Sequence, residues 1–362
     1  MKRNQSIDLL RSLALLLVMT RHCWVLTGYY PINFHPLSVL IQISGEIGVV
    51  LFFMLSGFGI YLSIESMIRK TGSFDFKTFM KARLKRVCPQ YFVCIFTLLL
   101  ITNQADNFGS MNGFWNIVTH ALFIHNWFGP YRGAIDGSLW TMGVTVQFYL
   151  IAYPLYLAFK KWGAKFWAVT ALFTIAMKAI AYAIVLPGIE NSTKYYFMAG
   201  RQLPTALDNF TTGMLVAYVV LKMPAIKKLY QALLGALASA GVLFALHYEG
   251  LAFGIHTNNI GGYTWHTLIS IALGLVMYFV YYIPCTGKHF ITKVFLWIAD
   301  CEYATYIWHI VIFENLILNA PLVYDLMTGR HPKLAYVPLV VFSLLFGGLM
   351  TQLIEPARRK NK

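Results

Sequence analysis

Long, nearly continuous apolar runs recur along the chain and predict an all-helical membrane protein. A helix needs roughly 20 mostly apolar residues to cross a hydrocarbon core about 30 Å thick. Because the runs are continuous rather than alternating, they favour helices over the strands of a membrane barrel. Ten predicted spans lie near residues 8–27, 44–64, 87–103, 139–159, 164–186, 203–221, 229–247, 263–283, 294–316 and 335–354.

The first of these runs differs from a signal peptide. Cleaved signals have a shorter apolar stretch that ends in a small-residue cleavage site. The run near residues 8–27 has full bilayer length, and no such site follows it. We therefore expect the first helix to remain in the protein.

Composition agrees with a membrane protein. Of the 362 residues, 58% are hydrophobic and 12% are charged, whereas an average soluble domain is roughly 25% charged. So little charge cannot cover a soluble surface, which excludes an ordinary cytosolic enzyme and a disordered chain. The net charge of +15 would ordinarily indicate nucleic acid or anionic lipid as a partner.

The placement of the positive charges explains the excess. With the N-terminus inside, 21 of the 29 Lys and Arg residues fall in inner segments, five in outer segments and three within spans. This asymmetry follows the positive-inside rule and predicts an even number of spans with both termini cytoplasmic. The positive charge is therefore explained by the position of the chain in a bilayer, and no nucleic-acid partner is needed to explain it.

The segments between spans are short, which predicts one transmembrane domain over residues 1–362. A basic cytoplasmic loop is expected at about 65–89, and an outer segment at about 104–138. The outer segment contains an apolar stretch at 114–124, and its composition predicts an interfacial or re-entrant piece over a polar cavity. An aromatic loop resting at the headgroups explains it equally well. Its notable residues are Trp115, His120, His125, Asn126, Trp127, Tyr131, Arg132 and Asp136.

The five cysteines give no disulfide or metal pattern. Only Cys23 approaches the outer side, and no Cys-x-x-Cys spacing occurs. We expect free thiols and no metal site.

Ionisable residues inside spans are the best candidates for function, because each is costly in hydrocarbon. Arg11 and His22 lie eleven positions apart, which places them within about 20° of one helix face and roughly 16 Å apart along the axis. The ninth span runs in the same direction. His22 and His309 each lie on the order of 21–23 Å above the inner edge of their spans, so the two histidines can share one level.

This arrangement suits general-base catalysis. Imidazole can take a proton from a hydroxyl as it attacks a carbonyl. A deep Arg11 can bind a phosphate or carbonyl oxygen, with Asp8 near enough in sequence to neutralise it. Spacing alone also permits plain hydrogen bonding between helices, or a charge-lined transport pathway.

Six short sequence motifs stand in order along the predicted spans. They are Arg11 to His22 (Arg-x10-His), Phe52-Phe-Met-Leu-Ser-Gly-Phe58, Arg83-Leu-Lys-Arg86 with Pro89 and Tyr91, Ser138-Leu-Trp140 with Phe148-Tyr149, Tyr303-Ala-Thr-Tyr306-Ile-Trp-His309, and Glu355-Pro356-Ala-Arg358. Together they resemble acyltransferase family three, the bacterial integral-membrane O-acyltransferases, over almost the entire chain and with the family's usual ten helices.

The resemblance implies transfer of an acyl group, commonly acetyl, from cytoplasmic acyl-CoA to a sugar hydroxyl of an extracytoplasmic or lipid-linked glycan. It implies a bacterial cytoplasmic (inner) membrane protein of the cell envelope. Arg83 and Arg86, one helical turn apart, and Arg11 would bind the phosphates of the donor. His22 would be the base and His309 would assist it.

One position departs from the family pattern. Family members often carry Glu a few residues after Ser-Leu-Trp, where this chain has Thr145. The role of that Glu would pass to Gln147, Asp136 or Glu302, with Glu302 a candidate relocated carboxylate, and Trp140 can stack on a sugar ring. A secondary transporter or exporter of a glycan or small polar solute is the main alternative, and a membrane scaffold without activity is a third.

Overall fold

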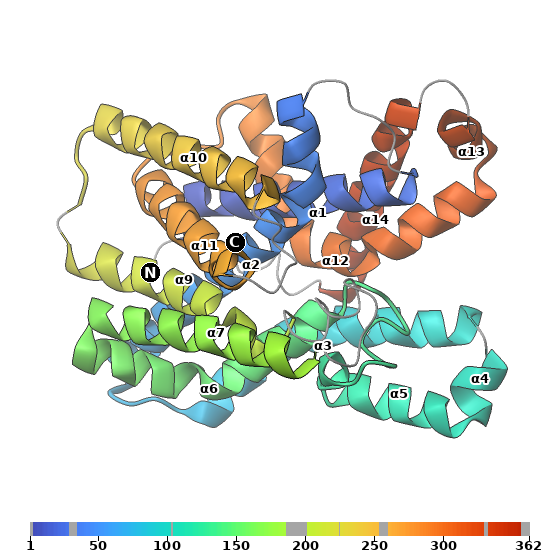
Figure 1. Cartoon of the computed structure of the whole chain (residues 1–362), viewed down its shortest axis with the longest axis horizontal. Coiled ribbons are helices and arrows are strands. Elements are labelled where there is room, and N and C mark those ends of the chain that lie inside the picture. Colours follow the sequence, from blue (N-terminus) through green and yellow to red (C-terminus); the bar gives the residue numbers. More distant parts are fainter. Residues whose placement is uncertain are drawn as a thin grey trace. The chain divides into compact units, whose positions relative to one another are not determined.

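The computed structural model describes residues 3–28, 35–102, 104–185, 201–223, 225–252, 260–328 and 332–355, and every regular element in these ranges is a helix (Figure 1). The all-α prediction is confirmed for this part of the chain. The elements are α1 Gln5–Leu26, α2 His35–Thr71, α3 Phe76–Ile101, α4 Gln104–Gly109, α5 Met111–Ala121, η1 His125–Trp127, α6 Trp140–Trp162, α7 Ala164–Val185, α9 Leu203–Lys222, α10 Leu229–Ala252, α11 Ile260–Tyr281, α12 Phe290–Asn319, α13 Pro321–Thr328, η3 Pro332–Ala335 and α14 Tyr336–Ile354.

Seven helices within the described ranges are long and apolar enough to cross a membrane. They are Gln5–Leu26, Leu37–Thr71, Phe76–Ile101, Trp140–Trp162, Ala164–Ile184, Ile260–Tyr281 and Lys333–Ile354. The other three predicted spans coincide with α9, α10 and α12. Helix α12 carries Asp300, Glu302, His309 and Glu314, and the shorter apolar stretch found in α10 is Leu229–Ala245. A multi-pass membrane protein is thus supported, while the count of ten and the cytoplasmic termini stay predictions.

The basic region at 65–89 is not a loop, which corrects the expectation from sequence. Helix α2 continues to Thr71 and α3 begins at Phe76, so the cations extend both helices beyond their apolar parts. Lys and Arg are good helix formers and allow this. The turn is defined by Gly72, which has φ +79° after the end of α2, and by Asp75, whose Oδ1 accepts from the Lys77 N–H at 3.0 Å.

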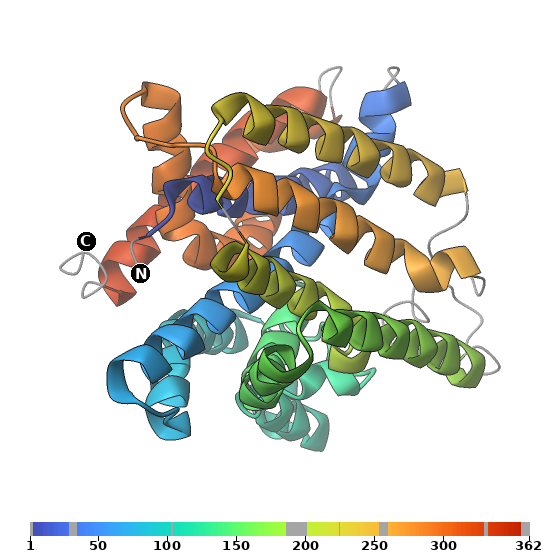
Figure 2. The same cartoon turned by 90° about the vertical axis from the view of Figure 1, so that its left-hand side faces the viewer.

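Contacts between Cα atoms divide the chain into two compact units. The first unit comprises Met1–Leu10, Val49–Lys81 and Thr141–Thr286. In it α10 lies along α11, and α9 packs against α7 and α11 (Figure 2). Glycines permit the closest approach in this unit, because a Cβ on Gly57 would meet the Phe210 backbone and one on Gly213 would meet the Met54 backbone.

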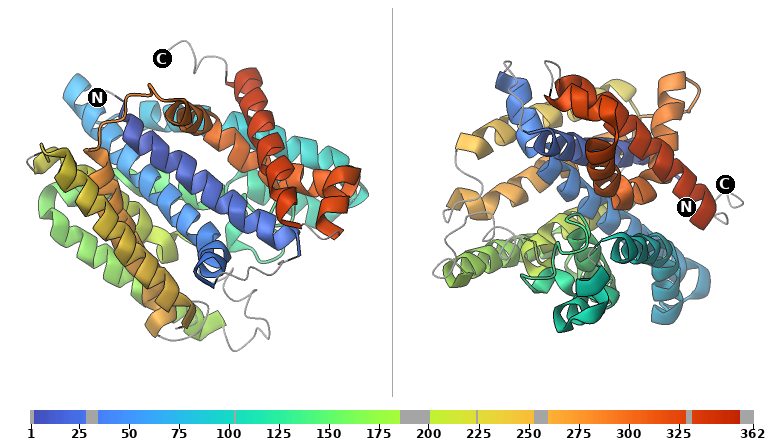
Figure 3. Two further views of the ribbon diagram at one scale, coloured as in Figure 1. Left: turned by 90° about the horizontal axis from the view of Figure 1, so that it is seen from above. Right: turned by 90° about the vertical axis from the view of Figure 1, so that its right-hand side faces the viewer.

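The second unit comprises Arg11–Gly48, Ala82–Trp140 and Gly287–Lys362, and contains most of the candidate site. Helices α12 and α14 pack against each other (Figure 3), and Gly347 has no room for a side chain beside Thr305. Helix α1 is tied to α12 because Ser12 Oγ donates to the Phe295 carbonyl. The single domain over residues 1–362 stays a prediction.

Candidate active site

His22 of α1 and His309 of α12 lie in direct contact in the second unit. Nδ1 of His22 is 2.7 Å from Nε2 of His309. The ring centroids are 4.9 Å apart and the ring planes differ by 23°. His309 is fully buried and His22 is half-buried. The common level expected for these two histidines therefore corresponds to a hydrogen-bonded pair.

The hydrogen-bond network assigns the protons of this pair. The carbonyl of Tyr306 only accepts, so Nδ1–H of His309 donates to it at 2.6 Å. In a neutral ring Nε2 of His309 is then the acceptor, and Nδ1–H of His22 donates to it. The lone pair of neutral His22 is consequently on Nε2, which is the state that a general base requires.

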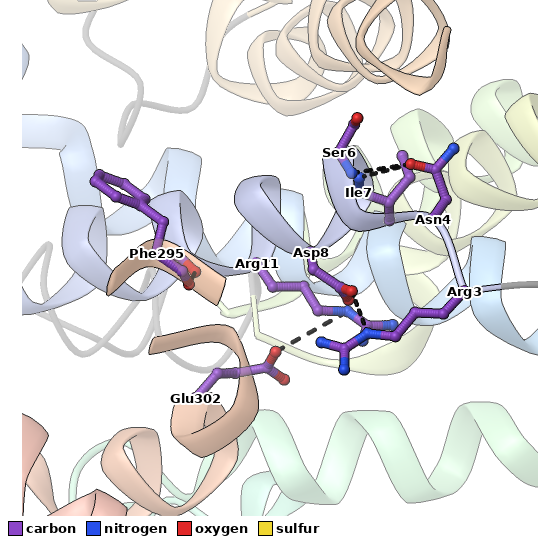
Figure 4. Close-up of polar contacts among 9 residues, drawn as sticks. Arg3, Asn4, Ser6, Ile7, Asp8, Arg11, Phe295 and Glu302 are labelled. Atoms are coloured by element: carbon purple, nitrogen blue, oxygen red, sulfur yellow. Dashed lines mark hydrogen bonds and ion pairs between the residues drawn. The ribbon is translucent and has the colours of Figure 1, made fainter. Parts of the chain in front are cut away.

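Arg11, Arg86 and Glu302 form a second polar group on the same two helices and α3. Nε of Arg11 lies 3.9 Å from Oε2 of Glu302 (Figure 4). A terminal guanidinium nitrogen of Arg86 lies 3.9 Å from Oε1 of the same carboxylate. Both distances exceed that of a hydrogen bond, so the carboxylate separates two guanidinium groups without binding either tightly.

Glu302, the candidate for a relocated carboxylate, lies beside the two arginines. It is buried, not at the lipid-facing surface, but its described contacts are with the arginines rather than with a histidine. Seven residues separate it from His309, or about 10 Å along a helix. This rise puts Glu302 nearer the level of the guanidinium groups than that of His309, and its role in place of the family Glu stays a prediction. Asp8, considered as a neighbour for Arg11, accepts from Arg3 (Figure 4).

The other predicted site residues are distributed over both units. Arg83 is half-buried on α3, one turn before Arg86 as expected. Trp140 is buried at the start of α6. Gln147 and Thr145 belong to α6 in the first unit, so their roles stay predictions. Arg358 of the last motif lies outside the described residues.

Asp136 is joined to the histidine pair through Tyr306, a residue whose role the sequence did not reveal. Oδ1 of Asp136 accepts from both N–H and Oγ of Ser138, each at 2.6 Å. The Tyr306 hydroxyl donates to the Ser138 carbonyl at 3.4 Å. Since the Tyr306 carbonyl also fixes His309, this tyrosine links the turn at Asp136 to the base. In the sequence, only the separation of three residues between Tyr306 and His309 indicated that the two residues lie on one helix face.

A second histidine pair, His120 and His125, lies before this turn. The rings stack with centroids 3.9 Å apart and planes 9° apart, and both side chains are fully buried. Burial lowers the pKa of His120 to about 4 and, together with the neighbouring His120, lowers the pKa of His125 to about 3. Both rings are thus neutral near pH 7. The sequence marked these residues only as part of an unusual outer segment.

Asp136 gives a prediction for stability against pH. Burial raises the pKa of its carboxyl from 3.8 to about 6, with Glu314 acting in the same direction and Ser138 opposing. A folded-state pKa above the unfolded value contributes stability that is complete below about pH 4 and is lost as the pH rises through 6. Asn does not titrate. Between pH 4 and 6 we therefore expect the free energy of unfolding of Asp136→Asn to rise by about 3 kcal/mol relative to that of wild type. Thermal unfolding of both proteins in detergent from pH 4 to 7 measures it. Parallel curves would contradict the assignment.

The family of the chain follows from comparison with known sequences. A family model described as an acyltransferase domain matches residues 4–352. The chain belongs to this acyltransferase family. The match covers both histidines of the His22–His309 pair and all three residues of the group around Glu302, so the resemblance seen in the motifs is confirmed.

Curated relatives of this acyltransferase domain are longer proteins. The O-acetyltransferase OatA of Staphylococcus aureus is 25% identical over 88% of this chain and 53% of its own length. The peptidoglycan O-acetyltransferase OatA of Listeria monocytogenes is 24% identical over 98% of this chain and 56% of its own. A regulator of hypoxia-inducible factor 1 from Caenorhabditis elegans is 30% identical over 34% of this chain and 25% of its own length. The chain thus spans about half the length of the OatA relatives and a smaller share of the Caenorhabditis elegans relative. No solved structure matches it.

Proposed function

We propose that the protein is a membrane O-acetyltransferase that moves an acetyl group from acyl-CoA to a hydroxyl of a glycan. The observation that carries the proposal is the bond from Nδ1 of His22 to Nε2 of His309, with His309 fixed by the Tyr306 carbonyl. Membership in the acyltransferase family and the O-acetyltransferase relatives support this activity. The acceptor is an extracytoplasmic or lipid-linked sugar, as the word peptidoglycan in one relative's name suggests.

In the proposed reaction Nε2 of His22 takes the proton of the acceptor hydroxyl as its oxygen attacks the thioester carbonyl. In the imidazolium that forms, Nδ1–H of His22 still donates its hydrogen bond to Nε2 of His309, so the pair shares the positive charge. The carbon–sulfur bond then breaks, and Nε2–H of His22 returns the proton to the departing thiolate. The ester and free CoA thiol are the products, and His22 is neutral again.

The donor fits the arginines chemically. One guanidinium group can bind two phosphate oxygens at once. Arg86 is partly exposed beside Arg11 and Glu302. Arg11 and His22 are roughly 16 Å apart along α1, which suits a donor whose phosphates and thioester are separated by a long flexible arm. We propose that the arginines face the cytoplasm and that the chain lies in the bacterial cytoplasmic membrane with both termini inside.

A reconstitution experiment tests this function against the exporter. Proteoliposomes that contain the full chain are given radiolabelled acetyl-CoA and an N-acetylglucosamine trisaccharide, and separately are loaded with the labelled trisaccharide alone. We expect acetyl label on the sugar and no release of the loaded sugar beyond that from empty liposomes. Release without acetyl-CoA, and without labelled ester, would contradict the proposal and favour an exporter.

A further inference from the structure

Helix α5 has the reverse of the usual surface pattern. A helix on a soluble protein turns its apolar face inward and its polar face to water. In α5 the buried residues are Gly113, Asn116, Thr119 and His120, whereas large apolar side chains are exposed on the helix and just after it: Met111, Phe114, Trp115 and Leu122. An apolar outer face suits lipid at the interface, so the polar face is directed into the protein.

Hydrogen-bonding atoms on and near this buried face have no partner among the described residues. They are Asn116 Oδ1, His120 Nε2, both ring nitrogens of His125, and Asp136 Oδ2. We call these four residues the lone-pair cluster. Nearly all buried polar groups in proteins are hydrogen-bonded, so such a concentration within one segment points to a ligand-binding site.

The ligand must bring donors. Nδ1–H of His120 donates to the Asn116 carbonyl at 2.9 Å, so Nε2 of this neutral ring only accepts. Asn116 Oδ1 and Asp136 Oδ2 are also acceptors. His125 is the exception, since its neutral ring offers one acceptor and one donor, and the Leu139 backbone lies near that ring. At least four acceptors therefore face at most one donor, and hydroxyl groups are the natural complement.

The backbone between the two histidines is strained to hold them together. Phe123 has φ 57°, a conformation that is rare for a bulky side chain. The Tyr91 ring stacks on Phe123 with centroids 4.5 Å apart, and its hydroxyl donates to the His120 carbonyl at 3.0 Å. This packing over-determines the turn, as at ligand sites.

The lone-pair cluster is joined to the histidine pair of the active site. Asp136 binds Ser138, Ser138 accepts from the Tyr306 hydroxyl, and the Tyr306 carbonyl accepts from His309. A molecule held by the cluster would thus be connected to the base through this chain of contacts.

We propose that Asn116, His120, His125 and Asp136 bind the non-reacting hydroxyl groups of the acyl acceptor, a polyhydroxylated sugar. This inference rests on the proposed function and names the residues that select a sugar over a simple alcohol. A site whose polar groups are satisfied only by the substrate rejects analogues that lack those groups.

The test compares two acceptors in the reconstituted full chain. Steady-state transfer from acetyl-CoA is measured to the N-acetylglucosamine trisaccharide and to 1-hexanol, which has one hydroxyl. For His120→Phe and His125→Phe we expect KM for the trisaccharide to rise about tenfold or more, as for loss of a hydrogen bond in a buried site, with the constants for hexanol and acetyl-CoA within about twofold of wild type. His125→Gln retains an acceptor and should recover part of the loss. His289→Asn, an exposed histidine before α12, is the matched control and should leave all constants unchanged.

Equilibrium binding of the labelled trisaccharide separates this inference from the proposed function. Weaker binding by His125→Phe than by wild type supports the proposed role of the cluster even if no transfer is observed. The absence of transfer would count only against the proposed acetyltransferase activity. Transfer by wild type with the same trisaccharide KM and binding in both phenylalanine variants overturns the inference alone. Equal losses for the trisaccharide and hexanol also overturn it, because they indicate a structural role.

Discussion

Replacing His22 with alanine is expected to lower kcat for acetyl transfer by about 10²- to 10⁴-fold, the range that a positioned general base contributes. The KM for acetyl-CoA should change little, because the phosphates of the donor are assigned to arginines about 16 Å away along α1. Transfer to the trisaccharide at saturating donor measures this loss. His289→Asn serves again as the control.

The double variant shows whether the two histidines act as one unit. His309 is the acceptor for Nδ1–H of His22 and sets its tautomer, so His309→Ala should also lower kcat, by a smaller factor. Because residues that act together are not additive, His22→Ala with His309→Ala should lose no more than His22→Ala alone. Losses that multiply would show that the histidines act independently and would remove the tautomer argument.

The second large effect concerns the donor. Arg86→Met and Arg11→Met are each expected to raise KM for acetyl-CoA by about 10- to 100-fold, as expected for a charge-assisted contact worth roughly 1.5–3 kcal/mol. The kcat should fall much less, since neither residue touches the histidine pair. Each side chain lies 3.9 Å from a carboxylate oxygen of Glu302, which is beyond the range of a hydrogen bond.

A phosphate-free donor provides the discriminating comparison. S-acetylpantetheine carries the thioester and the arm but no phosphate, so its KM should be the same for wild type and both arginine variants. Lys81→Met alters an exposed cation on α3 and should leave both donors unaffected. If the variants raised KM for S-acetylpantetheine as much as for acetyl-CoA, the arginines would have a structural role rather than a phosphate-binding one.

The sequence predicted the helices and the level of the histidines because both follow from helix geometry. Apolar runs locate the spans, and a rise of about 1.5 Å per residue gives His22 and His309 the same level. The same reasoning failed at residues 65–89, where charge was taken as the end of helix although Lys and Arg extend α2 and α3 into water.

Contacts that depend on side-chain direction were not predictable in this way. Glu302 was one of three candidates for the role of the family Glu, and its contacts with Arg11 and Arg86 could not be inferred from its position in the sequence. Tyr306 acts through its carbonyl, which any residue possesses, so no side-chain pattern could mark it. The pairing of His120 with His125 depends on the left-handed turn at Phe123. Phenylalanine rarely adopts this conformation, so the sequence did not predict it.

The central claim is that the His22–His309 pair transfers an acetyl group to a sugar hydroxyl. Its most direct test is a balance of products in one assay, with radiolabelled acetyl-CoA, the trisaccharide and the reconstituted full chain. For wild type we predict that alkali-labile label on the sugar equals the CoA thiol released, and that both disappear in His22→Ala. Thiol release without labelled sugar, or labelled ester formed undiminished by His22→Ala, would contradict the account.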